Sequence, residues 1–395
     1  MGVPTPFHDK MSARCASLRW KEWSGYFAPE KYDVVHDNEY HVLRQSAGFI
    51  DVSPLFKYEV RGPQAAKFLD YVMVRDIGRL KPMQVAYTAW CDEYGKTVDD
   101  GTVTRLAHDH FRITAAHPTL GWFQRFTRGF DVRVDDVSEQ IAALAVQGPR
   151  SRQVLVDAGF RQVEQLRFFH ATRDRANGVE AVLTRTGYTG DLGFEVWVEP
   201  RDAPRLWDML TRAGESHGAA PVGLLALDMV RIEAGFILID VDYTSARHAL
   251  IEEQKSSPFE IGLGWLVNLK KPDFVGREAL AQEKRKGSAW ALAGLEIDWE
   301  ELEALHDARG LPPALPATPW RHPVPLHDGS RQVGRATSGT WSPLLKRNLA
   351  LATVEAGYAV QGTEMQIDVM VEYERKTVTA RVVERPFFDP PRKRA

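Results

Sequence analysis

The sequence predicts an α+β protein with two related lobes followed by a region of short β-strands. With 395 residues, the chain is too long for a single hydrophobic core, so we expect about two or three domains. A strand followed by Gly-Pro and a helix occurs twice, over residues 58–73 and again over residues 141–158. From residue 290 onward, short strands recur at near-regular spacing, which is typical of a small barrel or sandwich.

The composition excludes several functional classes. The net charge of −3 offers no basic surface for nucleic acid. Two cysteines, Cys15 and Cys91, are too few for a disulfide framework or a cysteine metal site and fit a reducing compartment. The N-terminus lacks the apolar core of a signal peptide, and no apolar stretch is long enough to span a bilayer. We therefore expect a soluble cytoplasmic protein without nucleic-acid or membrane partners.

The first 130 residues or so alternate between helical and strand patterns. Residues 1–30 show no periodicity, and we expect an irregular segment held on the body by its aromatic side chains. The pattern predicts helices over 37–46, 64–73 and 119–126, and strands over 49–53, 58–61, 85–90, 97–104 and 111–114. A short glycine-containing turn joins the 85–90 and 97–104 strands, which therefore read as a hairpin.

The rest of the chain continues the mixed pattern and then becomes all β. We expect helices over 151–158, 204–214 and 223–235, and strands over 141–147, 179–184 and 194–198. An acidic loop follows at residues 240–243. The β-rich region contains predicted strands at 290–297, 333–343, 349–354, 365–371 and 376–383, interrupted by a proline-rich loop at 311–319.

The most distinctive stretch is Arg185–Glu195, which lies between two predicted strands and reads RTGYTGDLGFE. Its three glycines recur every third residue and permit a flat ligand to approach the backbone closely. Tyr188 can stack on a planar ring, and Glu195 can accept hydrogen bonds from the polar edge of that ring. The spacing alone equally fits a glycine-rich hairpin turn with a surface tyrosine.

Two adjacent aspartates, Asp99 and Asp100, interrupt the predicted 97–104 strand. Aspartate disfavours strand interiors, and only one of two neighbours can face a given side of a sheet. One carboxylate can therefore point into a site while the other points away. A solvated pair close to the turn is the alternative.

Segments along nearly the whole chain resemble the T-protein (aminomethyltransferase) family of the glycine cleavage system and its folate-dependent relatives. The matching segments occur in the family's order at residues 49–53, 61–63, 98–100, 144–149, 185–195, 228–235, 274–280 and 337–343. The resemblance implies a three-domain cloverleaf around a central folate channel, with a C-terminal β-barrel. The implied boundaries are 1–55 with 140–250 for the first lobe, 56–139 for the second, 251–284 for a connecting segment and 285–395 for the barrel.

The resemblance also implies site residues. Asp100 corresponds to the family's catalytic aspartate, with Asp99 as the fallback. Tyr188 and Glu195 correspond to the residues that hold the pterin of tetrahydrofolate, and Tyr87 to a tyrosine that contacts folate. A carboxylate such as Glu195 can accept two hydrogen bonds from the pterin edge. The remaining predicted folate-binding residues are Arg231 and Trp341.

Five residues depart from the aminomethyltransferase pattern. Pro54 and Leu55 stand where those enzymes have His-Met, and Leu227 replaces an arginine. His117 and Asp240 also replace other residues of the pattern. Leucine cannot take over the ionic role of a guanidinium. The resemblance places these residues where the one-carbon donor enters, so the donor side is predicted to differ while the pterin side is retained.

These observations lead to a folate-dependent one-carbon transferase. The leading form is a demethylase that moves a methyl group from a small-molecule donor to tetrahydrofolate. One alternative is a genuine aminomethyltransferase, which would need a lipoyl carrier protein as partner; another is a folate-binding protein without catalysis. We expect no metal site, because His108-Asp109-His110 with His117 reads as a turn between strands rather than as a zinc cluster.

Overall fold

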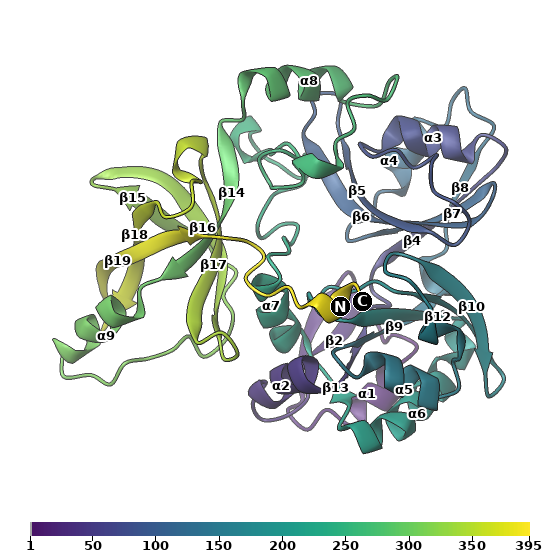
Figure 1. Cartoon of the computed structure of the whole chain (residues 1–395), viewed down its shortest axis with the longest axis horizontal. Coiled ribbons are helices and arrows are strands. Elements are labelled where there is room, and N and C mark those ends of the chain that lie inside the picture. The colour runs from purple at the N-terminus through teal and green to yellow at the C-terminus, as the bar shows by residue number, and fades with distance from the viewer. Residues whose placement is uncertain (1) are drawn as a thin grey trace.

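The computed structural model describes residues 2–395. Figure 1 shows three lobes arranged around helix α7 (Leu224–Glu233): two open sheets covered by helices, and a closed barrel. The predicted α+β class with two lobes and a C-terminal barrel is therefore confirmed. No helix within residues 2–395 has the combination of length and apolar character that crossing a bilayer requires.

The first lobe is a six-stranded mixed sheet with helices on both faces. Its strand order is β10 (Ala171–Ala176), β11 (Val179–Thr184), β12 (Gly193–Val198), β9 (Ala142–Gln147), β3 (Gly48–Asp51) and β13 (Ala220–Pro221). The apolar even-numbered residues of β9 pack with α1 (His8–Ser12), α5 (Ser151–Asp157) and α6 (Ala203–Gly214), and the odd-numbered alanines pack with α2 (Asp37–Gln45) and α7. A strand covered on both faces reads as a continuous apolar run, as β9 does.

The second lobe is a five-stranded antiparallel sheet. Its order is β5 (Val85–Cys91), β6 (Thr97–Ala107), β7 (His110–Ala115), β4 (Phe56–Arg61) and β8 (Arg133–Asp136), and its helices are α3 (Ala65–Val72) and α4 (Leu120–Arg125). Helix α8 (Arg277–Lys286) lies in the segment that leads to the barrel. β5 and β6 pair so that Ala89 lies opposite Asp100.

The Gly-Pro repeat has a physical basis in two glycines. Gly62 and Gly148 each follow a strand, precede a proline, and have positive φ angles of 138° and 126°. A Cβ atom on Gly62 would meet the backbone carbonyl of Asp131, and one on Gly148 would meet that of Ser46. Only glycine adopts this backbone without strain and leaves room for the neighbouring chain. The two lobes therefore share the same strand-to-helix corner.

The third lobe is a closed six-stranded barrel. The strands follow the order β14 (Trp290–Ile297), β17 (Arg347–Glu355), β16 (Arg331–Ser342), β15 (Val324–Asp328), β18 (Glu364–Val371) and β19 (Glu374–Val383), and helix α9 (Trp299–Asp307) packs against β19. β14 pairs with both β17 and β19, which closes the circle. Closure removes the exposed strand edges that an open sheet of this size would present.

The first lobe is joined to the barrel by a buried carboxylate at the end of α7. Glu233 accepts hydrogen bonds from the hydroxyl of Tyr40 (2.5 Å), from Nε of Arg44 (2.8 Å) and from the hydroxyl of Ser342 (2.5 Å). Tyr40 and Arg44 belong to α2, whereas Ser342 ends β16. Glu233 thus connects two helices of one lobe to a strand of another.

The N-terminal segment differs from the expected irregular structure. Besides α1, it contains the hairpin of β1 (Arg19–Trp23) and β2 (Tyr26–Lys31). Ser24 and Gly25 form its two-residue turn and both have positive φ, as tight hairpins of this kind require. The strands escaped prediction because their burial does not alternate strictly. Residue 1, also part of this prediction, lies outside the described residues.

Other elements were absent from the prediction, and they are short, exposed or at sheet edges. They comprise β8, β10, β13, β15, α8 and α9. The domain boundaries derived from the resemblance stay a prediction.

Candidate functional site

The glycine-rich stretch forms the connection between β11 and β12, which pair so that Thr184 lies opposite Glu195. Tyr188 lies within this connection and is half-buried. Its hydroxyl donates to the carbonyl of Ile237 at 2.5 Å, and its ring stacks on Phe236 with centroids 5.6 Å apart. The tyrosine is therefore held in one orientation and is not a free surface residue.

Gln147, at the end of β9, holds the connection through hydrogen bonds of its side-chain amide. Its amide nitrogen donates to the carbonyls of Thr186 (3.2 Å) and Phe194 (3.1 Å), and its amide oxygen accepts from the hydroxyl of Thr189 (3.1 Å). A Cβ atom on either of two glycines of the stretch, Gly187 or Gly193, would collide with this amide. The sequence reasoning did not single out Gln147; the available signal was one amide at the end of an otherwise apolar strand.

Glu195 is a carboxylate in the sheet whose charge is not neutralised by a cation within residues 2–395. Burial raises the pKa of Glu195 to about 7, and the hydroxyls of Thr186 and Thr184 act in the opposite direction. The ionised form of a carboxylate in such a place is stabilised when a ligand brings hydrogen-bond donors to it.

Strand alternation separates the two adjacent aspartates. Asp99 is fully buried and accepts hydrogen bonds from the backbone amides of Asp100 (2.8 Å) and His117 (3.1 Å). Burial and the charge of Asp100 raise the pKa of Asp99 well above its ordinary value. Asp100 points the other way and remains partly exposed. The Asp99 carboxylate therefore binds backbone amides, whereas the Asp100 carboxylate faces the other side of the strand.

Two tyrosine hydroxyls hold the Asp100 carboxylate. Tyr87 donates to Oδ2 at 2.6 Å and Tyr243 donates to Oδ1 at 2.5 Å. Burial raises the pKa of Asp100, and the two hydroxyls counteract it. Tyr188 lies close enough that, after burial, the Asp100 charge helps to raise the pKa of Tyr188. The structure thus brings Tyr87, Tyr188 and Tyr243 to Asp100. Of these, Tyr243 is the residue that the sequence did not predict.

Arg231 is fully enclosed, and its partners are protein groups. Its Nε donates to Asp228 at 2.7 Å, and its Nη1 donates to Asp242 at 2.5 Å and to the carbonyl of Phe236 at 3.1 Å. Its Nη2 is buried and has no hydrogen-bond partner among the described residues, and the predicted contact with folate stays a prediction. Arg231 holds Phe236, which in turn stacks on Tyr188.

Trp341 lies on β16, and its ring is near that of Trp299 from α9, with centroids 5.5 Å apart. Its prediction as a folate-binding residue receives no support from a contact with the Asp100 group. Trp341 is accounted for by packing between the barrel and its helix.

Three of the donor-side candidates are apolar and packed. Pro54 is buried, and Leu55 and Leu227 lie against the same core cluster between the first sheet and α7. The structure therefore brings Leu55 and Leu227 to one apolar region.

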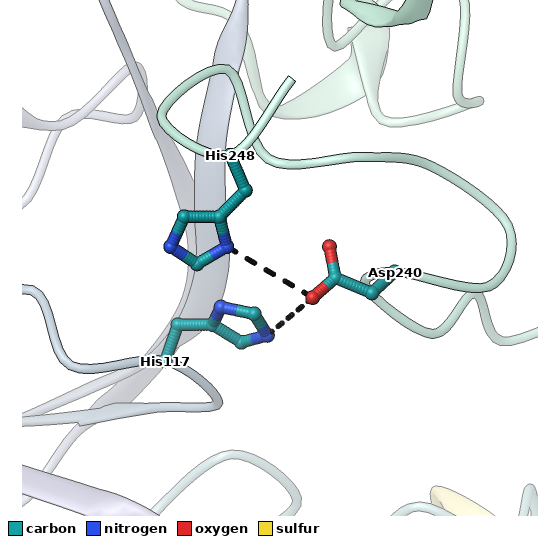
Figure 2. A group of neighbouring side chains, drawn as sticks. All are labelled: His117, Asp240 and His248. Carbon is teal, nitrogen blue, oxygen red and sulfur yellow. Dashed lines mark ion pairs between the residues drawn. The ribbon is translucent and has the colours of Figure 1, made fainter. Parts of the chain in front are cut away.

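The other two donor-side candidates meet each other. His117 follows β7, Asp240 lies in the loop after α7, and His117 Nε2 is 3.2 Å from Asp240 Oδ2 (Figure 2). His248, which the sequence did not single out, contributes Nδ1 at 3.9 Å from the same oxygen. Burial lowers the pKa of His117, and Asp240 opposes this. By contrast, His110 Nε2 lies 3.1 Å from Glu59 Oε2. The expected turn at His108-Asp109-His110 therefore does not contribute His110 to this group.

Comparisons with known proteins decide the family. Residues 6–271 match the family described as the GCVT N-terminal domain, and residues 309–389 match the glycine cleavage T-protein C-terminal barrel domain. The chain belongs to the glycine cleavage T-protein family. It is 34% identical over 374 residues to an aminomethyltransferase of Clostridium botulinum (strain 657 / Type Ba4), covering 93% of this chain and 92% of the relative.

Two further relatives of this T-protein family member extend over almost its full length. An aminomethyltransferase of Desulfitobacterium hafniense (strain DSM 10664 / DCB-2) is 31% identical over 97% of both chains. The crystal structure of glycine cleavage system aminomethyltransferase T from Bartonella henselae superposes with a TM-score of 0.84 at 26% identity, covering 98% of this chain and 99% of that chain.

Membership of the T-protein family makes the chain a folate-dependent one-carbon transferase with tetrahydrofolate as the acceptor. The residues present fit that molecule. Glu195 offers a carboxylate without a cationic partner among the described residues, and Tyr188, earlier in the same glycine-rich stretch, offers an oriented aromatic ring.

Proposed function

We propose that this T-protein family member transfers an aminomethyl-derived carbon to tetrahydrofolate. The observation that carries the proposal is the Asp100 carboxylate, which lies beside the glycine-rich connection and is held between two tyrosine hydroxyls. Support for an aminomethyl donor comes from relatives that bear the name aminomethyltransferase and are 31–34% identical over most of the chain.

Bound tetrahydrofolate would supply the nucleophilic nitrogen that receives the carbon. The ionised carboxylate of Glu195 would accept two N–H donors of the pterin and fix its orientation. The ring of Tyr188, backed by Phe236, would form a flat wall for it. Orientation of this kind removes much of the entropic part of a transfer barrier.

Asp100 would hold the proton that has to move during transfer. Because burial raises its pKa, Asp100 is a stronger base than an ordinary surface aspartate and can return the proton as an acid. Tyr87 and Tyr243 keep the carboxylate oxygens in place and stabilise the ionised form. Asp99, bound to two backbone amides, keeps the strand in position.

A second candidate is a demethylase that moves a methyl group from a small molecule to tetrahydrofolate. The observation in its favour is the donor side, where Leu55 and Leu227 form part of one apolar region. An apolar region suits a small donor better than the charged arm of a carrier protein. A reducing cytoplasmic location, predicted from the sequence, is compatible with either reaction.

The donor experiment separates these two candidates. Purified protein is incubated with tetrahydrofolate and an aminomethylated lipoyl carrier, and ammonia and methylene-tetrahydrofolate are measured. A parallel screen supplies methylated amines, methoxyaromatics and sulfonium compounds and detects methyl-tetrahydrofolate by mass. Enzyme-like release of ammonia supports the first candidate, whereas methyl-tetrahydrofolate from a small donor without ammonia release refutes it in favour of the second.

The site experiment compares two isosteric substitutions. We expect Asp100→Asn to lower turnover by roughly a hundredfold or more while the dissociation constant for tetrahydrofolate changes little. Glu195→Gln should instead weaken tetrahydrofolate binding, measured by calorimetry, because the amide donates where the pterin also donates. Glu199→Gln, an exposed glutamate beyond the end of β12, is the matched control. Wild-type behaviour of both site variants would exclude this site.

A further inference from the structure

Three side chains from segments far apart in the sequence meet beside the Asp99–Asp100 strand. Figure 2 shows the rings of His117 and His248 on one side of the Asp240 carboxylate, both directed at the same oxygen. One ligand-type atom from each of the three residues lies within 4.8 Å of the other two. The three residues are called the His-Asp-His cluster below.

The spacing of the His-Asp-His cluster matches a metal coordination shell. Bonds of about 2.0–2.1 Å to a tetrahedral metal place neighbouring ligand atoms about 3.3 Å apart. The Asp240 oxygen is 3.2 Å from His117 Nε2 and 3.9 Å from His248 Nδ1. The two histidine nitrogens lie within 4.8 Å of each other, so the imidazoles must move closer together to bring all three atoms onto one ion.

The donor set indicates the class of metal. Two imidazole nitrogens and one carboxylate oxygen suit divalent transition metals such as Zn²⁺, Co²⁺ or Fe²⁺, whereas Ca²⁺ and Mg²⁺ prefer oxygen alone. Three protein ligands leave at least one coordination position open. The side chains of Asp240 and His248 are 46% and 48% exposed, so that position can be reached from solvent.

The backbone holds each member of the His-Asp-His cluster in place. The amide of His117 donates to the Asp99 carboxylate at 3.1 Å, and the amide of Asp240 donates to the Tyr243 carbonyl at 2.7 Å. The amide of His248 donates to the carbonyl of Ser245, whose hydroxyl donates to the Val98 carbonyl at 2.6 Å. Ligands carried on anchored segments lose little freedom when an ion binds.

A simple ion pair accounts for less of this arrangement. Asp240 needs only one histidine to form an exposed ion pair, and such pairs contribute little to stability. Here a second imidazole lies against the first, with ring centroids 4.9 Å apart. Two imidazoles and a carboxylate around one point form a ligand set, which a single ion pair does not require.

We propose that the His-Asp-His cluster of His117, Asp240 and His248 binds one divalent transition-metal ion, of which Zn²⁺ is the best match, with an open coordination position. The segments that supply His117 and Asp240 also supply the partners of Asp99 and Asp100. A role of this ion in the reaction rests on the proposed one-carbon transfer. The open position would take the donor's nitrogen, oxygen or sulfur atom, which keeps the electron pair when its bond to the transferred carbon breaks.

The metal alone tests the site, without folate or donor. Protein stripped with a chelator is dialysed against Zn²⁺, and bound metal is measured by mass spectrometry; Co²⁺ replaces Zn²⁺ for visible absorption. We expect about one equivalent bound and an intense tetrahedral Co²⁺ spectrum. Asp240→Asn and His248→Gln should bind at least about tenfold more weakly. Asparagine tolerates the positive φ of Asp240, and circular dichroism verifies the fold of each variant.

His108→Gln is the matched control, because it removes an exposed histidine on the β6–β7 turn outside the cluster. Binding in this variant should equal that of the wild type. Wild-type binding no tighter than that of Asp240→Asn, or an equal loss in His108→Gln, would overturn the proposal. Turnover is measured separately, so an incorrect donor assignment leaves the metal result intact.

Discussion

Two pairs of carboxylates, one pair buried and the other partly buried, differ in their partners. Glu233 and Asp242 each contact an arginine, Arg44 and Arg231 respectively, and each also accepts hydrogen bonds from hydroxyls of the barrel. Their charges are balanced, and their contacts join α2, α7 and β16. These carboxylates hold the lobes together.

Glu195 and Asp100 have hydroxyls around them but no cationic partner in the described part of the chain. Burial raises the pKa of both carboxyls. Removing a carboxylate from water without a cation is costly, and proteins keep such groups where a ligand or a proton completes them. The difference between the two pairs therefore separates residues of the scaffold from residues of the proposed site.

The largest expected effect comes from breaking a balanced pair. Asp242→Ala leaves the Arg231 guanidinium short of a buried partner, and we expect the free energy of unfolding to fall by about 3–5 kcal/mol. Chemical denaturation followed by circular dichroism measures it. Asp273→Asn, at an exposed position outside this loop, should stay within about 0.5 kcal/mol. Equal losses in the two variants would contradict the scaffold role of Asp242.

The unbalanced Glu195 should respond with the opposite sign. Its pKa is raised from 4.5 to about 7, so the destabilisation caused by its charge grows between these two pH values, is complete above pH 7, and disappears once both the folded and unfolded states are protonated. Glu195→Gln should therefore raise the free energy of unfolding at pH 8, on the order of 2–3 kcal/mol. The gain should shrink steadily toward pH 4.5. A variant less stable than wild type at pH 8 would show that the charge is balanced after all.

A smaller effect is expected at the tyrosines that hold Asp100. Tyr243→Phe removes one of two hydroxyls that lower the Asp100 pKa, so the acidic limb of the pH–turnover profile should move to higher pH. The free energy of unfolding should fall by about 1 kcal/mol. Tyr87→Phe should move the profile in the same direction. A profile unchanged in both variants would remove Asp100 from the rate-limiting chemistry.

The smallest expected effect concerns an ion pair at the surface, and it tests whether an ion pair contributes to stability when it is not buried. Lys10 and Asp208 form an exposed ion pair at 2.6 Å, with side chains 36% and 52% exposed. Lys10→Ala should change the free energy of unfolding by less than about 1 kcal/mol. A loss as large as that of Asp242→Ala would mean that burial is not what distinguishes the central pairs.

Local patterns were sufficient for much of the fold. Alternation, glycine breaks and the apolar run of β9 predicted most helices and strands of the two lobes, and the C-terminal strands predicted the barrel region. The N-terminal hairpin and the edge strand β8 were missed because they are short and only partly buried. Such strands depend on pairing partners more than on their own residues.

The site shows where sequence reasoning ends. Asp100, Tyr87 and Tyr188 came from motif positions, and the structure brings them together. Tyr243 reaches Asp100 from 143 residues away, so no local pattern could reveal the contact. The motif that contains Arg231 does not disclose its protein partners Asp228 and Asp242. The catalytic and folate-binding roles themselves stay predictions until the variants are measured.

The Gln147 amide beneath the glycine-rich connection has an evolutionary consequence. A side chain at Gly187 or Gly193 would collide with this amide, so a change at either glycine has to displace the amide from its hydrogen bonds. A smaller residue at 147 would first release Thr186 and Phe194, which the amide holds. A single substitution at position 147, 187 or 193 therefore breaks these hydrogen bonds. We therefore expect that homologues with a different residue at position 147, 187 or 193 differ at all three positions.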